Sequence, residues 1–179
     1  MKLSSVSISA LYAGLFFSGA VQAFSANTIQ FIGEIADQTC NVSVNGSHDS
    51  PVVLLPTVSK SELNSAAKTA GAASFTIKIT GCAAEPDDQA IKARFIANHL
   101  TASKRIGNTG DASNVSLEIF DPRNAAVTID HTGITPAPGL FLPAGATEAA
   151  YDYGVRYYAE GAATAGSVAG SVQYALSYR

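Results

Sequence analysis

Short rows of apolar residues at alternate positions recur along the chain, and they restrict its fold more than any other feature. Successive side chains of an extended strand point to opposite faces, so each row would form one apolar face. Links that contain proline or glycine separate the rows, which predicts one antiparallel β-sandwich, with a helical turn expected only within residues 60–70. The rows are Phe75, Ile77 and Ile79; Ile91, Ala93 and Phe95; Val115, Leu117 and Ile119; Tyr151, Tyr153, Val155 and Tyr157; and Val172, Tyr174, Leu176 and Tyr178.

The first 23 residues have the features of a secretory signal peptide. Lys2 provides a positive start, and residues 10–21 form a compact apolar stretch. The small residues Val21 and Ala23 predict cleavage before Phe24. The stretch is too short, and too rich in glycine and serine, for a membrane span of about 20 residues. We therefore expect an exported protein that keeps no membrane anchor after cleavage.

Charge and composition exclude several classes of partner and activity. The chain has a formal net charge of −3, and 14% of its residues are charged, so neither nucleic acid nor an anionic membrane is an expected partner. His48, His99 and His131 are far apart in the sequence and belong to no nucleophile or metal pattern. We expect no enzymatic activity, no cofactor and no small-molecule substrate.

The chain has two cysteines, Cys40 and Cys82, and both lie in the exported part. In an oxidising compartment, such a pair is expected to form one disulfide bond. Closing a loop of this size would stabilise the fold by about 4 kcal/mol in the chain-entropy model. A zinc site would need further ligands, and His48 is the only histidine between the two cysteines.

Both ends of the exported chain have strand patterns that suit pairing with another chain. Ile29, Phe31, Gly33 and Ile35 alternate in the first strand, and the last strand runs to Arg179 without a polar tail. A long apolar strand at the edge of a sheet invites pairing, and natural proteins normally blunt such edges. Taken by itself, the alternation in the first strand favours an ordinary core strand of a complete sandwich.

Several stretches together resemble a known family, the chaperone–usher pilins, and within it the type 1-like fimbrial subunits. They are "TIQFIGEIADQTCNV" at the start, "ITGC" at the second cysteine, "NVSLEIFDPRNAAVTID" in the middle and "VRYYAEGAATAGSV" before the last strand. The C-terminal signature of the family is a penultimate tyrosine and a glycine fourteenth from the end. Tyr178 and Gly166 occupy these two positions, and the resemblance covers essentially the whole chain.

The resemblance implies an incomplete immunoglobulin-like β-sandwich that lacks its last strand. Residues 24–38 would be an N-terminal donor-strand extension, and residues 39–179 would be the pilin domain. A periplasmic chaperone would first lend a strand to the open groove. At the outer-membrane usher, the extension of the next subunit would then replace that strand, a form of β-augmentation.

The resemblance also assigns roles to individual residues. Gly33 would match a groove site that is too shallow for a side chain, and basic residues of the chaperone would hold the carboxylate of Arg179. The extension is short at its start, which leaves open which residue fills the site before Ile29. The donor strand would present Asn27, Ile29, Phe31, Gly33 and Ile35, and Gly166, Tyr174, Leu176, Tyr178 and Arg179 would serve the groove and recognition by the chaperone and usher.

The sequence thus predicts a structural subunit of an adhesive surface fimbria, with identical or related pilin subunits, the chaperone and the usher as partners. It would be exported through the periplasm to a fimbrium on the bacterial surface. The alternative is a free-standing secreted β-sandwich that acts as a lectin-like or receptor-like binding module.

Overall fold

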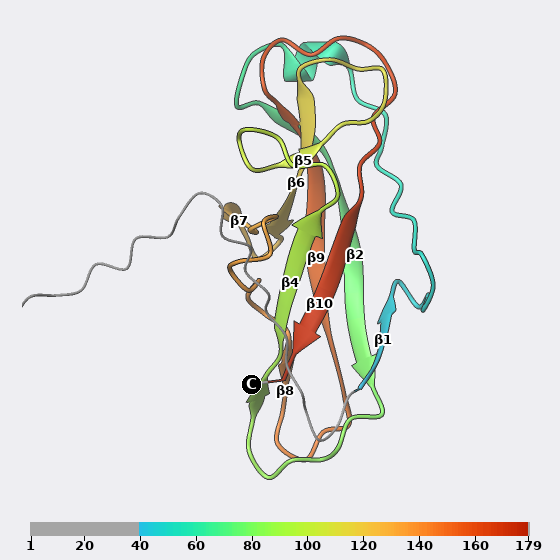
Figure 1. Ribbon diagram of the computed structural model, residues 1–179, viewed down its shortest axis with the longest axis vertical. Coiled ribbons are helices and arrows are strands. Elements are labelled where there is room, and N and C mark those ends of the chain that lie inside the picture. The colour runs from blue at the N-terminus through green and yellow to red at the C-terminus, as the bar shows by residue number, and fades with distance from the viewer. Residues whose placement is uncertain (1–39, 179) are drawn as a thin grey trace, which may run out of the picture. The chain divides into compact units, whose positions relative to one another are not determined.

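The computed structural model describes residues 40–178, which form ten strands and one short 3-10 helix (Figure 1). The expected signal peptide and donor-strand extension lie outside the described residues, as does Arg179. The elements are β1 (Asn41–Val44), η1 (Lys60–Leu63), β2 (Thr69–Thr80), β3 (Gln89–Ala90), β4 (Lys92–Ala97), β5 (Ile106–Gly107), β6 (Val115–Asp121), β7 (Asn124–Thr128), β8 (Phe141–Leu142), β9 (Glu148–Ala159) and β10 (Val172–Ser177).

The larger sheet has the strand order β1-β2-β9-β6-β5, with β7 paired to β6, and all its pairs are antiparallel. Its centre is the pairing of the long strands β2 and β9, which is interrupted by a bulge between Ala70 and Ala73. Gly71 lies in this bulge with φ +61°, and a Cβ there would lie 2.7 Å from the Tyr157 ring and 2.8 Å from Val58. Glycine is therefore required by both the backbone conformation and the space.

A second layer is built on β4, which pairs antiparallel with β10 on one edge. On its other edge, isolated bridges join Ile96 to Thr132 and Ala93 to Ala137, so the coil between β7 and β8 extends this layer. Figure 1 shows β10 on one side of β4 and that coil on the other. A third, short pairing joins β3 to β8.

The core lies between the two layers and contains the apolar rows that the sequence predicted. The rows on β2, β4 and β6 are buried, whereas the row on β10 is only half-buried. Phe75, Phe95 and Tyr153 pack ring against ring at the centre, with centroid distances of 5.2 to 6.1 Å. Such contacts add about 1 kcal/mol each to the area that the rings bury. The immunoglobulin-like, all-β fold expected from the sequence is confirmed.

The helical turn and the disulfide bond that the sequence predicts are both present. The helical turn expected in residues 60–70 is the 3-10 helix η1, which begins with a capping box of Ser59 and Glu62. The end of that segment belongs to β2, which begins at Thr69, and Gly71 lies in the bulge of this strand. A disulfide bond joins Cys40, just before β1, to Cys82, just after β2.

One part of the larger sheet is buried on both faces, which the sequence did not predict. On β6, Ser116 and Glu118 alternate with the apolar row, and they are 0% and 1% exposed. The side chains of Arg105 and Arg156 lie against this outer face and pair with Glu118. Among residues 40–178, no helix is long and apolar enough to cross a membrane.

Candidate functional site

The candidate site is the free edge of β10. This strand pairs with β4 from Val172 to Ser177, and within the described part of the chain no strand pairs with its opposite edge. Val172, Tyr174 and Leu176 point to the core side but remain half-buried. An unpaired edge with half-buried apolar side chains is a template for one more strand.

The opposite wall is the segment 51–58, which belongs to no strand. Half-buried and exposed residues alternate along most of it. Val53 and Leu55 point inward, whereas Val52 and Leu54 are 77% and 84% exposed. The backbone of this segment makes no hydrogen bond to another described residue. Since backbone N–H and C=O groups require partners, this wall also offers a strand-like edge.

A first cavity of about 370 Å³ lies between these two walls. Val53 and Leu55 line one side, and Val172 and Tyr174 line the other. Its floor is apolar and comes from four strands of the larger sheet, namely from Phe75, Ile106, Leu117, Ile119 and Val155. The cavity therefore opens directly onto the core.

A second cavity, of about 490 Å³, follows along the same two segments. Thr57 and Val58 line one side, and the stretch 166–168 lines the other. Leu63, Val115 and Tyr157 contribute to its floor. We call the two cavities together the edge groove, which is bounded by residues 51–60 and 166–174.

Gly166 lines the second cavity of the edge groove and lies close to the backbone of the loop 108–112. A Cβ at this position would lie 2.5 Å from the backbone nitrogen of Ala112, a distance that real Cβ atoms essentially never show. The adjacent backbone is fixed by hydrogen bonds from Ala112 N–H to the carbonyl of Ser167, 3.0 Å, and from Thr109 N–H to that of Ala169, 2.8 Å. The absence of a side chain at Gly166 therefore allows the last segment to lie against the loop 108–112.

The remaining residues that the sequence proposed for the groove lie at its other end or outside the described range. Leu176 packs against the core but lines neither cavity. The Tyr178 hydroxyl accepts a hydrogen bond from the Cys40 N–H, and its carbonyl accepts one from Gln89 Nε2 at 2.7 Å. The proposed donor row and Arg179 fall outside residues 40–178.

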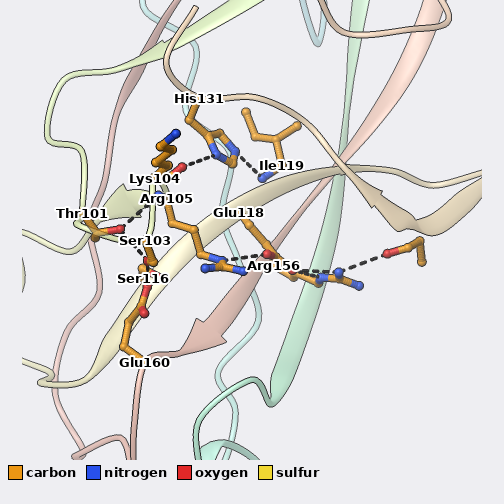
Figure 2. Close-up of polar contacts among 11 residues, drawn as sticks. Thr101, Ser103, Lys104, Arg105, Ser116, Glu118, Ile119, His131, Arg156 and Glu160 are labelled. Carbon is orange, nitrogen blue, oxygen red and sulfur yellow. Dashed lines mark hydrogen bonds and ion pairs between the residues drawn. The ribbon is translucent and has the colours of Figure 1, made fainter. Parts of the chain in front are cut away.

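A buried polar cluster lies on the outer face of β6 (Figure 2). The Glu118 carboxylate pairs with Arg105 Nε at 3.0 Å and with Arg156 at 2.7 Å. The Arg105 guanidinium also stacks on the Tyr158 ring, and that of Arg156 stacks on Phe120. Sequence reasoning missed this cluster, because Glu118 occupies a position of β6 that alternation assigns to solvent. The only sign of this cluster in the sequence is that Glu118 lies between two apolar residues of a predicted strand.

His131 joins the same region, and its ring is held by two backbone groups. Nε2 accepts a hydrogen bond from Ile119 N–H at 2.9 Å, and Nδ1 lies 3.3 Å from the Lys104 carbonyl oxygen (Figure 2). Burial lowers the pKa of His131, although the Lys104 carbonyl and the charges of Glu118 and Asp130 oppose this effect. Sequence reasoning assigned no role to His131.

Comparison with known proteins places the chain among fimbrial subunits. A family model described as fimbrial protein matches residues 29–179. The chain is 32% identical over 162 residues to the major fimbrial subunit SMF-1 of Stenotrophomonas maltophilia (strain K279a), an alignment that covers 84% of this chain and 91% of that protein.

Two solved structures share the fold at low sequence identity. One is the P pilus rod subunit PapA, with a TM-score of 0.60 at 12% identity, covering 78% of this chain and 99% of that one. The other comes from a structure of a chaperone–usher pilus that addresses rod uncoiling. It has a TM-score of 0.59 at 15% identity and covers 87% of this chain and 96% of that one.

Proposed function

Because this chain belongs to the fimbrial protein family and is an exported structural subunit of an adhesive surface fimbria, we propose that its subunits join by donor-strand exchange. Residues 24–38 of one subunit insert into the edge groove of the next. The free-standing binding module is not favoured, because the relatives are fimbrial subunits. The role is structural, and we propose no catalytic activity for the chain.

The observation that carries this proposal is the pair of unpaired edges on either side of the groove. β10 on one side and residues 51–58 on the other have no strand between them within residues 40–178. A strand inserted here gains main-chain hydrogen bonds from both edges, and its alternate side chains enter the two cavities. The apolar floor of Phe75, Leu117 and Ile119 favours apolar side chains on the inserted strand.

The donor row fits these requirements in its chemistry and spacing. Ile29, Phe31 and Ile35 are apolar and lie at alternate positions, whereas Gly33 suits a shallow site between larger ones. Burying a side chain as large as Phe31 stabilises the contact by about 2 to 3 kcal/mol. Before polymerisation, a periplasmic chaperone occupies the same groove, and the outer-membrane usher directs the exchange.

A peptide competition experiment tests this assignment directly. The subunit is purified as its chaperone complex, and a synthetic peptide of residues 24–38 is added while release of the chaperone is followed by chromatography. We expect Phe31→Ser to slow the release at least tenfold, since 1.4 kcal/mol corresponds to a factor of ten. Ile32→Ser is the matched control, because Ile32 is equally apolar but lies off the donor row.

The control should release the chaperone at nearly the rate of the unchanged peptide. Equal loss with Phe31→Ser and Ile32→Ser would show that the alternating row does not select the groove. Release that is insensitive to both changes would place the donor strand elsewhere in the chain.

A further inference from the structure

A buried histidine closes the sandwich on the side of the second layer that lies away from the edge groove. His131 is 3% exposed, and its backbone carbonyl accepts a hydrogen bond from Ala97 N–H of β4 at 2.9 Å. Its ring bonds to Ile119 of β6 in the other sheet. One residue thus joins the two layers across the edge of β4 opposite to β10.

The partners of the ring determine its protonation state. The Ile119 backbone N–H can only donate, so Nε2 must be the unprotonated acceptor. The proton is then on Nδ1, which faces the Lys104 carbonyl. Protonating Nε2 would set two donors against each other in a buried site, and the Ile119 N–H would lose its acceptor. Leaving a buried donor without an acceptor destabilises the folded state.

The charged groups around His131 come from every element packed against it. Glu118 faces it from β6, Lys104 and Arg105 from the segment before β5, and Asp130 precedes it in the chain. From β4, Arg94 donates to the carbonyls of Gly133 and Ile134, in the same coil. A cavity of about 440 Å³, lined in part by Lys104, Asp130 and His131, reaches this cluster and gives water access to it.

Among these groups, His131 is the one whose ordinary pKa lies near 6.5, within the mildly acidic range. Burial raises the pKa of Asp130, but hydrogen bonds from Thr135 and Thr132 outweigh this effect, so its pKa is lowered and it stays ionised at pH 5. Glu118 is held by two arginines. Because burial lowers the pKa of His131, the folded subunit takes up this proton below pH 6.5, and the stability that the neutral ring contributes is lost as the pH falls below that value.

We propose that His131 is an acid-sensitive latch between the two sheets. Its protonation removes the acceptor of the Ile119 N–H and releases the His131 end of the coil 129–138 from β6 at mildly acidic pH. The Ile129 N–H keeps its hydrogen bond to the Ile119 carbonyl. The Ile119 side chain lines the first cavity of the edge groove, so the release also loosens the floor of that groove. This inference rests on the chain being a fibre subunit, and it does not depend on which segment fills the groove.

The latch is tested on assembled fibres of the full chain. Guanidinium dissociation of the fibre is measured at pH 7.5 and pH 5.0 for the unchanged subunit, for His131→Gln and for His48→Gln. The glutamine amide cannot gain a charge, so we expect His131→Gln to shrink the drop in midpoint between the two pH values to half or less. His48 is exposed, and its substitution should leave the drop unchanged. An equal drop in all three proteins would overturn the proposal.

A second measurement uses only the unchanged protein, so it tests the latch even if His131→Gln fails to assemble. Hydrogen exchange of unchanged fibres is compared at the two pH values, after correction for the intrinsic pH dependence of exchange. Peptides from residues 115–121 and 127–138 should lose protection at least tenfold at pH 5.0, whereas those from β2 should not. Unchanged protection of residues 115–121 would overturn the latch even if the fibre itself remains intact.

Discussion

The Tyr178 hydroxyl accepts a hydrogen bond at 3.3 Å from the backbone N–H of Cys40, which lies 138 residues earlier in the chain. The end of the last strand is thereby joined to the disulfide-bonded start of the domain. Phenylalanine at position 178 could not make this contact, because it lacks the hydroxyl group that accepts the hydrogen bond. A partly buried amide N–H needs an acceptor, and the Tyr178 hydroxyl supplies it.

Replacing Tyr178 by phenylalanine should therefore weaken the subunit without changing its packing. The Cys40 N–H would lose its partner, so we expect the free energy of unfolding to fall by about 1 kcal/mol. The guanidinium midpoint of fibre dissociation measures this change. Tyr158→Phe is the control, because the Tyr158 ring stacks under Arg105 and its hydroxyl has no hydrogen-bond partner within residues 40–178. Equal effects of the two substitutions would contradict the role of the hydroxyl.

Gly166→Ala should damage the second cavity of the edge groove. The new Cβ would collide with the backbone of Ala112, and backbone must move to relieve the clash, which costs about 1 to 3 kcal/mol. We expect a lower yield of the chaperone-bound subunit and fewer fibres by electron microscopy. In the same loop, a Cβ at Gly161 would make only ordinary contact, 3.5 Å from Asn114 Cγ. If Gly161→Ala reduces the yield as much as Gly166→Ala does, close approach at residue 166 is not the cause.

Glu118→Ala should be one of the most damaging single changes outside the groove. It leaves Arg105 and Arg156 without their carboxylate in a largely buried site, and loss of one partner from such a set costs about 3 kcal/mol or more. Glu148→Ala is the comparison, since the pair Lys78–Glu148 is exposed and should contribute less than about 1 kcal/mol. Fibre dissociation in guanidinium measures both variants. Similar midpoints for the two variants would contradict a strong contribution of the cluster, because water would then solvate both arginines adequately without Glu118.

The buried tyrosines predict a defined response to alkali. Burial raises the pKa of Tyr151, Tyr153 and Tyr157, with a further contribution at Tyr151 from its hydrogen bond to Asp121. The folded state therefore favours the neutral phenols. The stability that they contribute is fully present below about pH 10, the ordinary pKa of tyrosine, and is lost as the pH rises through the raised pKa values of the folded state. Absorbance at 295 nm should rise in two stages, with the second stage coinciding with loss of the β-sheet circular dichroism signal.

Tyr153→Phe should reduce the amplitude of that second stage, because Tyr153 is 0% exposed. Its hydroxyl also donates to the Pro138 carbonyl at 3.1 Å, so the variant should be slightly less stable at neutral pH. A single stage near pH 10 in the unchanged protein would contradict the burial of these phenols.

Much of the fold could be predicted from the sequence, because alternation reports directly on which face of a strand is buried. The rows of Phe75, Leu117 and Tyr153 all face the core. The short strands β3, β5 and β8 could not be predicted, since two residues carry no periodic signal. The double burial of β6 was also missed, because the arginines that make Glu118 tolerable inside come from positions 13 and 38 residues away.

Only one of the two walls of the edge groove could be predicted from the sequence. The family resemblance implied that the last strand forms one wall, and the alternating apolar residues of that strand agree with it. The opposite wall was missed, although "PVVLLPTV" contains alternating inward and outward apolar residues between prolines. The prolines at positions 51 and 56 and the uninterrupted apolar run conceal the alternation. The donor row in residues 27–35 remains a prediction.

The disulfide bond has a mechanical consequence for a subunit in a filament. Any tension that arrives along the N-terminal segment reaches the domain at Cys40, directly before the four-residue strand β1. Without the covalent link, that tension would peel β1 from β2 one hydrogen bond at a time. The bond to Cys82 passes the load directly to the C-terminal end of β2, which lies beside Cys40. This strand is twelve residues long and pairs with β9.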